Sequence, residues 1–277
     1  METYWEKTLE QQHRQVVVEL DETKPMNKMK IRNEMEGNTM LTIHDTTRAF
    51  ERAAPTIAVL PIGAVEQHGS HLPVGTDCLI AGHWAERIAR ELNAYLLPVI
   101  PITSSIEHRQ ARGTVYLKAA TLGSIVQDVA ESLQYDGFSQ LIIVNGHGGN
   151  WILKPTVRQL NRDLDGLMTI LIDTNVGIRR AHEVMEHTAN DIHAGEHETS
   201  IMMHLHPELV GQVSEPTDRR FYPQDYLDYF DSAELTEDGY WGYPECATDD
   251  KGRRMMDIMV ENALDVIRKL TLMRHNK

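Results

Sequence analysis

The sequence is poor in cysteine, in positive charge and in long apolar runs, and each shortage excludes a class of protein. Two cysteines, Cys78 and Cys246, form no disulfide framework and are typical of a reducing cytoplasm. With 27 lysines and arginines against 41 acidic residues, the formal net charge is -14. This charge argues against nucleic-acid and anionic-membrane partners, because both require a basic surface. No apolar run reaches the ~18 residues of a membrane span, and no signal-peptide pattern opens the chain. We therefore expect a cytoplasmic protein that binds neither nucleic acid nor membrane.

The 277 residues are enough to bury a sizeable core, and 41% hydrophobic with 25% charged residues is ordinary for a globular protein. Residues 1–38 differ from the rest. They are charged, have few aliphatic residues outside Val16–Leu20, and include Pro25 and Gly37. We interpret them as an N-terminal extension before a larger domain over residues 39–277. A helix with a linker, an arm on a neighbouring subunit and a disordered tail all fit this composition.

Four apolar runs rich in β-branched residues predict buried strands. Each is followed by a polar loop or by apolar residues that recur at helical spacing. The strands are expected at Ile57–Ile62, Tyr95–Ile102, Leu141–Val144 and Met168–Ile172. The first expected helix follows a cap at Asp45 or Thr46, and the second covers residues 79–93. The third runs from a cap at Thr121 or Ser124 to Leu133, and the fourth from a cap at Asn150 to about Leu164. This alternation predicts an α/β fold with a mostly parallel central sheet and helices on both faces.

The polar loop after the first expected strand, residues 61–77, concentrates side chains that carry chemistry. Glu66 and His68 are two residues apart, so on an extended chain both side chains leave on the same face. With His71 and Asp77 they offer the carboxylates and imidazoles that bind Zn, Mn or Fe. Two other interpretations stay open: a polar loop with hydrogen-bonded histidines, and Asp77 as the N-cap of the next helix.

Polar residues also follow the other expected strands, and the carboxyl ends of parallel strands meet at one edge of a sheet. Glu107 and His108 follow the second strand, and His147 follows the third inside the sequence NGHGGN. The glycines of this loop let the backbone approach a ligand closely, but their spacing matches neither a P-loop nor a dinucleotide fingerprint. His147 is therefore a candidate metal ligand, and a glycine turn with an incidental histidine is the alternative.

Residues 182–206 hold six of the 14 histidines. Glu198 lies one helical turn before Met202, so its side chain is expected to face inward near the start of a helix. His193, just ahead of that helix, is a candidate ligand or proton donor. His197 is expected on another face of the helix and outside the site. The remaining four are interpreted as surface or packing residues: His182, His187, His204 and His206.

The motifs EQHGSHLPVGTD, SSIEH, NGHGGN and HAGEHETS together resemble the creatininase family of metal-dependent amidohydrolases. A later stretch, GYWGYPECATDDKG, looks like the loop before the last helix of that family. The resemblance runs from about Ile57 to Leu270, with the motifs in the family's order. It implies a three-layer α/β/α fold, a small-molecule substrate and a homo-oligomer, often a hexamer.

The resemblance also implies two divalent metal ions per chain, zinc first, with manganese or iron as alternatives. Glu66 and His147 would hold one ion and His68 the other, with Asp77 bridging both. In creatinine-hydrolysing members a carboxylate stands where this chain has Gly149, so Glu198 is expected to supply the last ligand, as in the NGHGGN-type branch. His193 matches a histidine used for proton transfer to the leaving group. Glu107 and His108 are expected to orient the substrate or the attacking water.

Two further departures bear on the substrate. Gly148 and Ala189 stand where creatinine-acting members carry an aromatic residue and a tryptophan. Without these rings creatinine is a doubtful substrate, and His108, Gly148, Gly149 and Asn150 are our candidates for substrate contacts.

Two cations lower the pKa of a shared water from 15.7 toward about 7, and the resulting hydroxide attacks a carbonyl carbon. The first hypothesis is hydrolysis of a C–N bond in a small, non-peptide cyclic amide or formamide. The second is hydrolytic C–C cleavage of a cyclic diketone, such as a diketo-inositol of the 3-dehydro-scyllo-inosose type. The third, from another class, is a non-catalytic assembly or precursor-processing partner, against which the intact ligand set argues.

Overall fold

A computed structural model describes residues 40–213 and 220–275. The chain divides into two units, Met1–Glu36 and Gly37–Lys277, and the description below concerns the second alone. The predicted extension, residues 1–38, lies outside the described residues.

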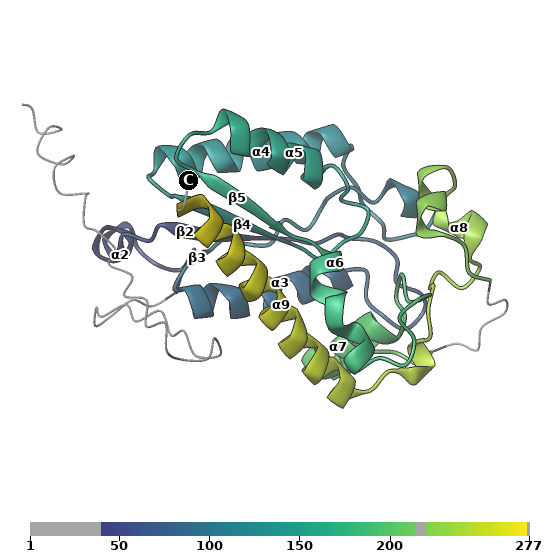
Figure 1. Ribbon diagram of the computed structural model, residues 1–277. Coiled ribbons are helices and arrows are strands. Elements are labelled where there is room, and N and C mark those ends of the chain that lie inside the picture. Colours follow the sequence, from purple (N-terminus) through teal and green to yellow (C-terminus); the bar gives the residue numbers. More distant parts are fainter. Residues whose placement is uncertain (1–39, 214–219, 276–277) are drawn as a thin grey trace, which may run out of the picture. The chain divides into compact units, whose positions relative to one another are not determined.

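A five-stranded parallel sheet forms the centre of the described region (Figure 1). Its strands lie in the order β1 (Leu41–Thr42), β3 (Tyr95–Leu96), β2 (Ile57–Ile62), β4 (Gln140–Asn145) and β5 (Met168–Ile172). β2 and β4 form the middle of the sheet, with Ile57 opposite Gln140 and Ile62 opposite Asn145. The two strands therefore end together, and the loops that follow them start side by side at one edge.

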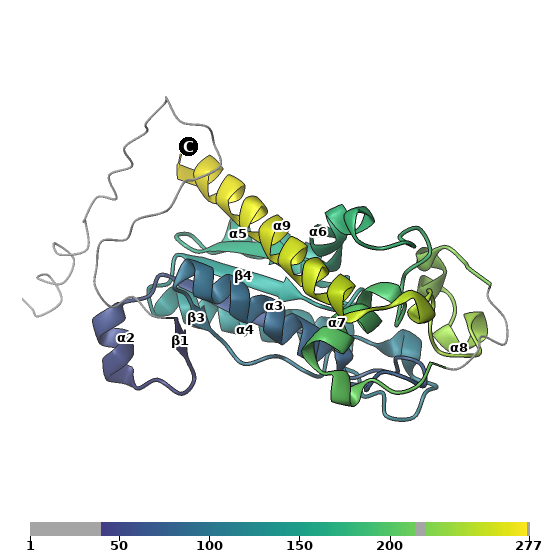
Figure 2. The same ribbon diagram turned by 90° about the horizontal axis from the view of Figure 1, so that it is seen from below.

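Helices cover both faces of this sheet, as Figures 1 and 2 show. On one face lie α4 (Ala119–Tyr135) and α5 (Leu153–Asp163); on the other lie α3 (Thr76–Leu92), α7 (Glu196–Leu205) and α9 (Asp249–His275). The shorter elements are α2 (Thr47–Ala53), η1 (Ile106–His108), α6 (Thr174–Gly177), η2 (Ile178–Glu183), η3 (Pro207–Leu209), η4 (Gln224–Asp228), α8 (Ser232–Leu235) and η5 (Pro244–Cys246).

Alternation along the strands divides the core into two layers, one on each face of the sheet. Leu141 and Ile143 of β4 pack toward α4 and α5, whereas Ile142 and Val144 pack toward α3 and α9. All four side chains are fully buried, as a central strand covered on both faces requires. The three-layer α/β/α fold expected from the sequence is confirmed.

The second expected strand is much shorter than predicted. Only Tyr95 and Leu96 form β3, instead of the whole run to Ile102. Pro98 and Pro101 lack backbone N–H groups, so this run cannot form a continuous hydrogen-bonded ladder. It still follows β2, because the backbone N–H of Ile100 donates to the carbonyl of Pro61.

Three predicted helix starts need correction. α4 begins at Ala119 with Lys118 at the N-cap, and neither Thr121 nor Ser124 caps it. α5 begins at Leu153 after Ile152, because the side chain of Asn150 bonds elsewhere. Asp77 lies inside the first turn of α3, whose N-cap is Gly75, so its carboxylate is not a cap. Thr46 does hold the N-cap position of α2.

Candidate metal centre

The candidate ligands come together at the carboxyl edge of the sheet. They lie on the loops after β2 and β4 and on the first turns of α3 and α7. Glu66 and His68 follow β2, and His147 follows β4. Two glycines let α3 approach these strand ends: a Cβ on Gly63 would lie 2.6 Å from the Cα of Cys78, and one on Gly146 would lie 2.8 Å from the carbonyl oxygen of Asp77. The first turn of α3 is therefore held against both loops, which places the Asp77 side chain between them.

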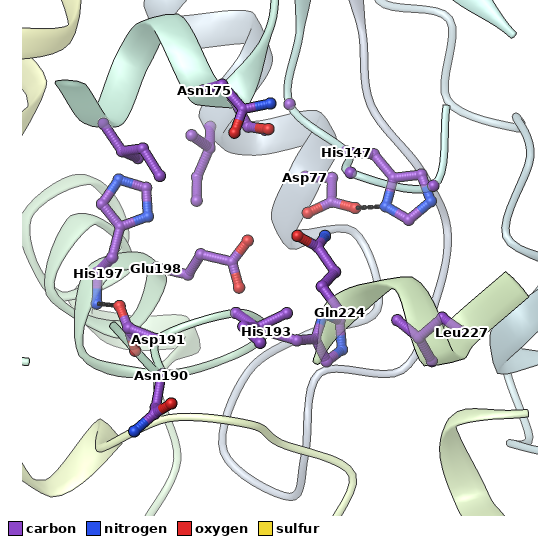
Figure 3. Close-up of a pocket in the computed structure, with 18 of the residues that line it drawn as sticks. Asp77, His147, Asn175, Asn190, Asp191, His193, His197, Glu198, Gln224 and Leu227 are labelled. Carbon is purple, nitrogen blue, oxygen red and sulfur yellow. Dashed lines mark hydrogen bonds and ion pairs between the residues drawn. The ribbon is translucent and has the colours of Figure 1, made fainter. Parts of the chain in front are cut away.

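Asp77 directs its two carboxylate oxygens to different histidines, His68 and His147. Figure 3 shows the one toward His147. Oδ1 lies 3.1 Å from Nε2 of His68, and Oδ2 lies 3.2 Å from Nδ1 of His147. Oε1 of Glu66 lies 3.2 Å from the same Nδ1, and Oε2 of Glu198 lies 3.8 Å from Nε2 of His68. The five side chains thus form two groups around one aspartate.

These side chains fit divalent cations. Glu66 and Asp77 are 0% and 1% exposed, yet both oxygens of Glu66 and Oδ2 of Asp77 accept no hydrogen bond from any described residue. A buried carboxylate oxygen without a donor is costly, and a cation removes that cost. Carboxylate oxygen and imidazole nitrogen are ordinary ligands of Zn and Mn.

The charges of the cluster also favour a bound cation. Burial alone would lower the pKa of His68, but Asp77, Glu198 and Glu66 raise it to about 10. The pKa of His147 is likewise raised well above its usual value, because Glu66, Asp77 and Glu107 outweigh the effect of burial. Burial and the neighbouring Asp77 raise the pKa of Glu198. The cluster therefore has an excess of negative charge that a cation would neutralise.

Backbone carbonyls fix which nitrogen of each candidate ligand faces the cluster. Nδ1 of His68 lies 3.1 Å from the carbonyl of Glu66, and Nε2 of His147 lies 2.9 Å from the carbonyl of Ser104. With one nitrogen of each ring donating to a carbonyl, the opposite nitrogen faces the carboxylates and would give up its proton when a cation binds. This is the arrangement that orients metal-bound histidines.

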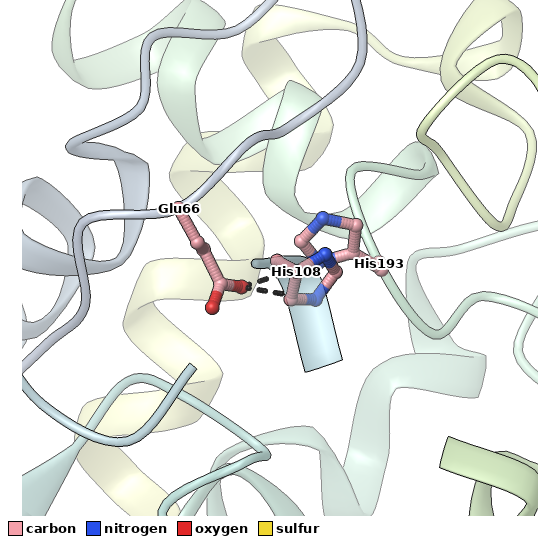
Figure 4. A group of neighbouring side chains, drawn as sticks. All are labelled: Glu66, His108 and His193. Atoms are coloured by element: carbon pink, nitrogen blue, oxygen red, sulfur yellow. Dashed lines mark ion pairs between the residues drawn. The ribbon is translucent and has the colours of Figure 1, made fainter. Parts of the chain in front are cut away.

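His193 and His108 lie beside Glu66, with stacked rings whose centroids are 4.5 Å apart (Figure 4). Nδ1 of His193 and Nε2 of His108 each lie 3.6 Å from Oε1 of Glu66. Nε2 of His193 donates to the carbonyl of Gln67 across 2.7 Å. Burial lowers the pKa of both histidines, and His68 adds to the effect at His193. Both rings are therefore neutral, and His193 keeps a lone pair on Nδ1 beside the cluster.

Glu107 lies behind His147, with Oε1 3.5 Å from Nε2 of that ring. Although its burial favours the neutral acid, His147 holds the pKa of Glu107 below its usual value, so this carboxylate is ionised. It also fills the space beside Gly149, where a Cβ would lie 1.9 Å from Oε1 of Glu107. A side chain at position 149 would displace it.

The cluster opens into a cavity of about 540 Å³. Glu66, Asp77, His147, His193 and Glu198 line it, together with predicted substrate contacts His108, Gly148 and Gly149. Asn150 does not line it: this side chain is buried, donates to Gly63 and Asn145, and accepts from the backbone N–H of Ser104. His71 is also elsewhere, bonded to Thr199.

Several lining residues were not expected from the sequence. They are Trp84, Asn175, His197, Phe221, Gln224 and Leu227. His197 was assigned to another face of its helix, but in the first turn of α7 both His197 and Glu198 reach the cavity (Figure 3). Gln224 had no sequence signal, since it comes from a short 3-10 helix far along the chain.

Comparisons with known proteins agree with this fold. The chain is 29% identical to a mycofactocin precursor peptide peptidase of Mycobacterium ulcerans (strain Agy99) over 77% of this chain and 85% of that protein. It is 25% identical to the creatinine amidohydrolase of Pseudomonas putida over 78% and 90%. A solved structure of creatinine amidohydrolase (creatininase) superposes with a TM-score of 0.70 at 25% identity, covering 83% of this chain and 97% of that one.

Two further relatives are described by other reactions. One is a 3-dehydro-scyllo-inosose hydrolase of Thermotoga maritima, 25% identical over 62% of this chain and 58% of that protein. The other is a 2-amino-5-formylamino-6-ribosylaminopyrimidin-4(3H)-one 5'-monophosphate deformylase of Methanococcus maripaludis, 25% identical over 51% and 59%. A family model for creatinine amidohydrolase matches residues 41–267, which is most of the chain, and this hydrolase therefore belongs to the creatininase family.

Proposed function

We propose that this hydrolase binds two divalent cations, zinc first, at the cluster around Asp77. Glu66, His147 and one oxygen of Asp77 would hold the first ion; His68, Glu198 and the other oxygen of Asp77 would hold the second. The observation that carries this proposal is the position of Asp77, whose oxygens lie 3.1 and 3.2 Å from two different imidazoles. When bound, such a pair of cations lowers the pKa of water and polarises a carbonyl.

Side chains of the protein would then transfer protons and orient the substrate. His193 is neutral, and the Gln67 carbonyl fixes its Nε2, so Nδ1 is free to carry a proton to the leaving group. His108 is held at Nδ1 by Ser232 and Gln67, which directs its Nε2 toward Glu66. Glu107 would orient His147 from behind.

We propose a C–N bond as the first target, in a small cyclic amide or a formamide. Membership of an amidohydrolase family and the relative described as a deformylase support this choice. Creatinine itself fits poorly, since Gly148 and Ala189 offer no aromatic face for a flat ring. The relative that acts on an inosose keeps C–C cleavage of a cyclic diketone as the alternative to be assayed.

A peptide bond is a second candidate, which two observations favour. Relatives at 29% identity are described as peptidases of a precursor peptide. The cavity of about 540 Å³ is within the range of ~300 to ~1,000 Å³ that holds drug-sized ligands. A cytoplasmic location and a homo-oligomeric state, including a hexamer, remain further predictions of this proposal.

Metal analysis combined with a substrate panel tests the proposal. The purified chain, loaded with Zn, Mn or Fe, is assayed on formamides, lactams, diketo-inositols and short peptides. Asp77→Asn should lose most of the bound metal and at least ~100-fold of the activity, because it removes a ligand common to both ions. Asp128→Asn, on the exposed face of α4, is the matched control. Equal metal content in Asp77→Asn and wild type would refute the assignment.

A further inference from the structure

A second group of metal-binding side chains lies outside the centre described above. Glu186, His187 and Cys246 place a carboxylate oxygen, an imidazole nitrogen and a thiol within 4.8 Å of one another. Oxygen, nitrogen and sulfur ligands together are a zinc-type set. Cys246 forms no disulfide, and its thiol is partly accessible.

The backbone on both sides of this group is fixed by one ion pair, whose carboxylate is fully buried. Glu196 is 0% exposed and accepts the backbone N–H groups of Glu186 and His187 at 3.0 and 2.9 Å. Lys251 lies 2.6 Å from Glu196 and donates to the carbonyl of Cys246 at 2.7 Å. The Glu196–Lys251 pair therefore holds the loop before α7 and the 3-10 helix before α9 in a constant relation. The three ligands are brought together by this scaffold.

The charges of the group allow a divalent cation. Lys251 also contacts Oε1 of Glu186 at 2.7 Å, so Glu186, Glu196 and a Cys246 thiolate would share three negative charges with one ammonium. A divalent ion makes this set neutral, and the thiol proton leaves to solvent on binding. Ligand atoms in a tetrahedral zinc site are about 3.5 Å apart, for bonds of ~2.0 to ~2.3 Å, so rotation of the exposed Glu186 side chain and small shifts of the other two close the remaining distance.

We propose that Glu186, His187 and Cys246 form a third cation site, specific for zinc-type ions and separate from the dinuclear centre. Its His187 ring stacks on Tyr243 at 3.8 Å, and Tyr243 contacts Phe221 of the cavity wall. An ion bound here holds this ring stack in place and so stiffens one wall of the cavity. Three protein ligands leave a fourth position for water.

Cobalt titration of the full-length, metal-stripped chain tests this site independently of the dinuclear centre. Cobalt bound to a thiolate gives a near-ultraviolet charge-transfer band, which a centre of carboxylates and imidazoles cannot give. Wild type should show the band, and Cys246→Ser should lose it together with one equivalent of bound cobalt. His187→Gln should weaken binding at this site by ~100-fold or more, since losing even a partner behind a ligand costs ~10- to ~100-fold.

Two controls keep the outcome unambiguous. His182→Gln changes an exposed histidine outside the group and should leave the band unchanged. Cys78→Ser should also keep it, because the Cys78 thiol donates to the carbonyl of Ala64 instead. Absence of the band in folded wild type, or its survival in Cys246→Ser, would overturn this site even if the dinuclear centre loads normally. Loss of cobalt from the dinuclear centre with the band intact would overturn only the proposed function.

Discussion

Asp77 is a residue for which two sequence patterns predicted two different roles. It follows a polar loop with metal-ligand spacing, and it begins a helix, so both a ligand and a cap were open interpretations. Gly75 holds the cap position, which leaves both oxygens of Asp77 free to face His68 and His147. The start of α3 at Thr76 therefore excludes the cap, and the ligand stays a prediction.

Substitution of Gly149 tests how closely single residues pack around the candidate centre. A Cβ there would lie 1.9 Å from Oε1 of Glu107 and 2.4 Å from Nε2 of His147, so Gly149→Ala must displace one or both. We expect it to destabilise the protein by about 1 to 3 kcal/mol and to weaken metal binding, as measured by urea unfolding and chelator competition. Gly75→Ala, where no atom lies within 4 Å, is the control and should change metal affinity little.

His71 predicts a pH dependence of stability. Burial lowers its pKa from 6.5 to about 4, so the unfolded state binds the proton more readily between these values. Stability from this group is complete above pH 6.5 and falls as the pH drops toward 4. With 1.36 kcal/mol per pKa unit, about 2 kcal/mol is lost by pH 5.

Urea unfolding at pH 7 and pH 5, with a chelator present throughout, measures this loss. His71→Gln should reduce the difference in unfolding free energy between the two pH values by about that amount. His182→Gln, an exposed histidine, should leave it as in wild type. An unchanged difference in His71→Gln would show that this ring is not the acid-sensitive group.

At the scale of elements, the crossing of α7 and α9 positions Glu198. A Cβ on Gly252 of α9 would lie 1.9 Å from the carbonyl oxygen of Ser200 in α7, so the two backbones are in direct contact. α7 begins at Glu196, and Glu198 lies in its first turn. A shift of α7 away from α9 would therefore move this candidate ligand relative to His68.

Gly252→Ala tests that contact. We expect a loss of about 2 kcal/mol or more, because the clash with backbone exceeds the ~1 kcal/mol that alanine gains in helix propensity. Thermal unfolding should show a Tm lower by roughly 4 to 8 °C. Gly123→Ala in α4 meets only the side chains of Thr156 and Ile152, at 3.2 and 3.5 Å, and should change Tm much less. Equal effects of the two substitutions would contradict a close crossing at Gly252.

At the scale of the whole molecule, the candidate centre brings together distant parts of the described region. Glu66 comes from the loop after β2 and Glu198 from α7, which packs on α9 near the end of the chain. Bound metal should therefore stabilise the fold as a unit. No helix in the described residues is both long and apolar enough to cross a bilayer.

Removal of metal measures this stabilisation. At a free metal concentration ~100 times the Kd, binding adds about 2.7 kcal/mol, so a chelator should lower Tm by roughly 5 to 10 °C. In Asp77→Asn the chelator should lower Tm much less than in wild type. A chelator-insensitive wild type that was shown to be metal-loaded would argue that the ions bind away from this centre.

The sequence alone determined the alternation of strands and helices, because period and composition are local properties. Ile57–Ile62 and Met168–Ile172 were predicted at their observed bounds, and Glu66, His68 and His147 were identified because polar residues after parallel strands share one edge. The inclusion of His197 and Gln224 in the cavity wall depends on contacts between distant segments. Only the tertiary structure decided these, since the direction of a side chain in the first turn of a helix or in a loop is set by what packs against it.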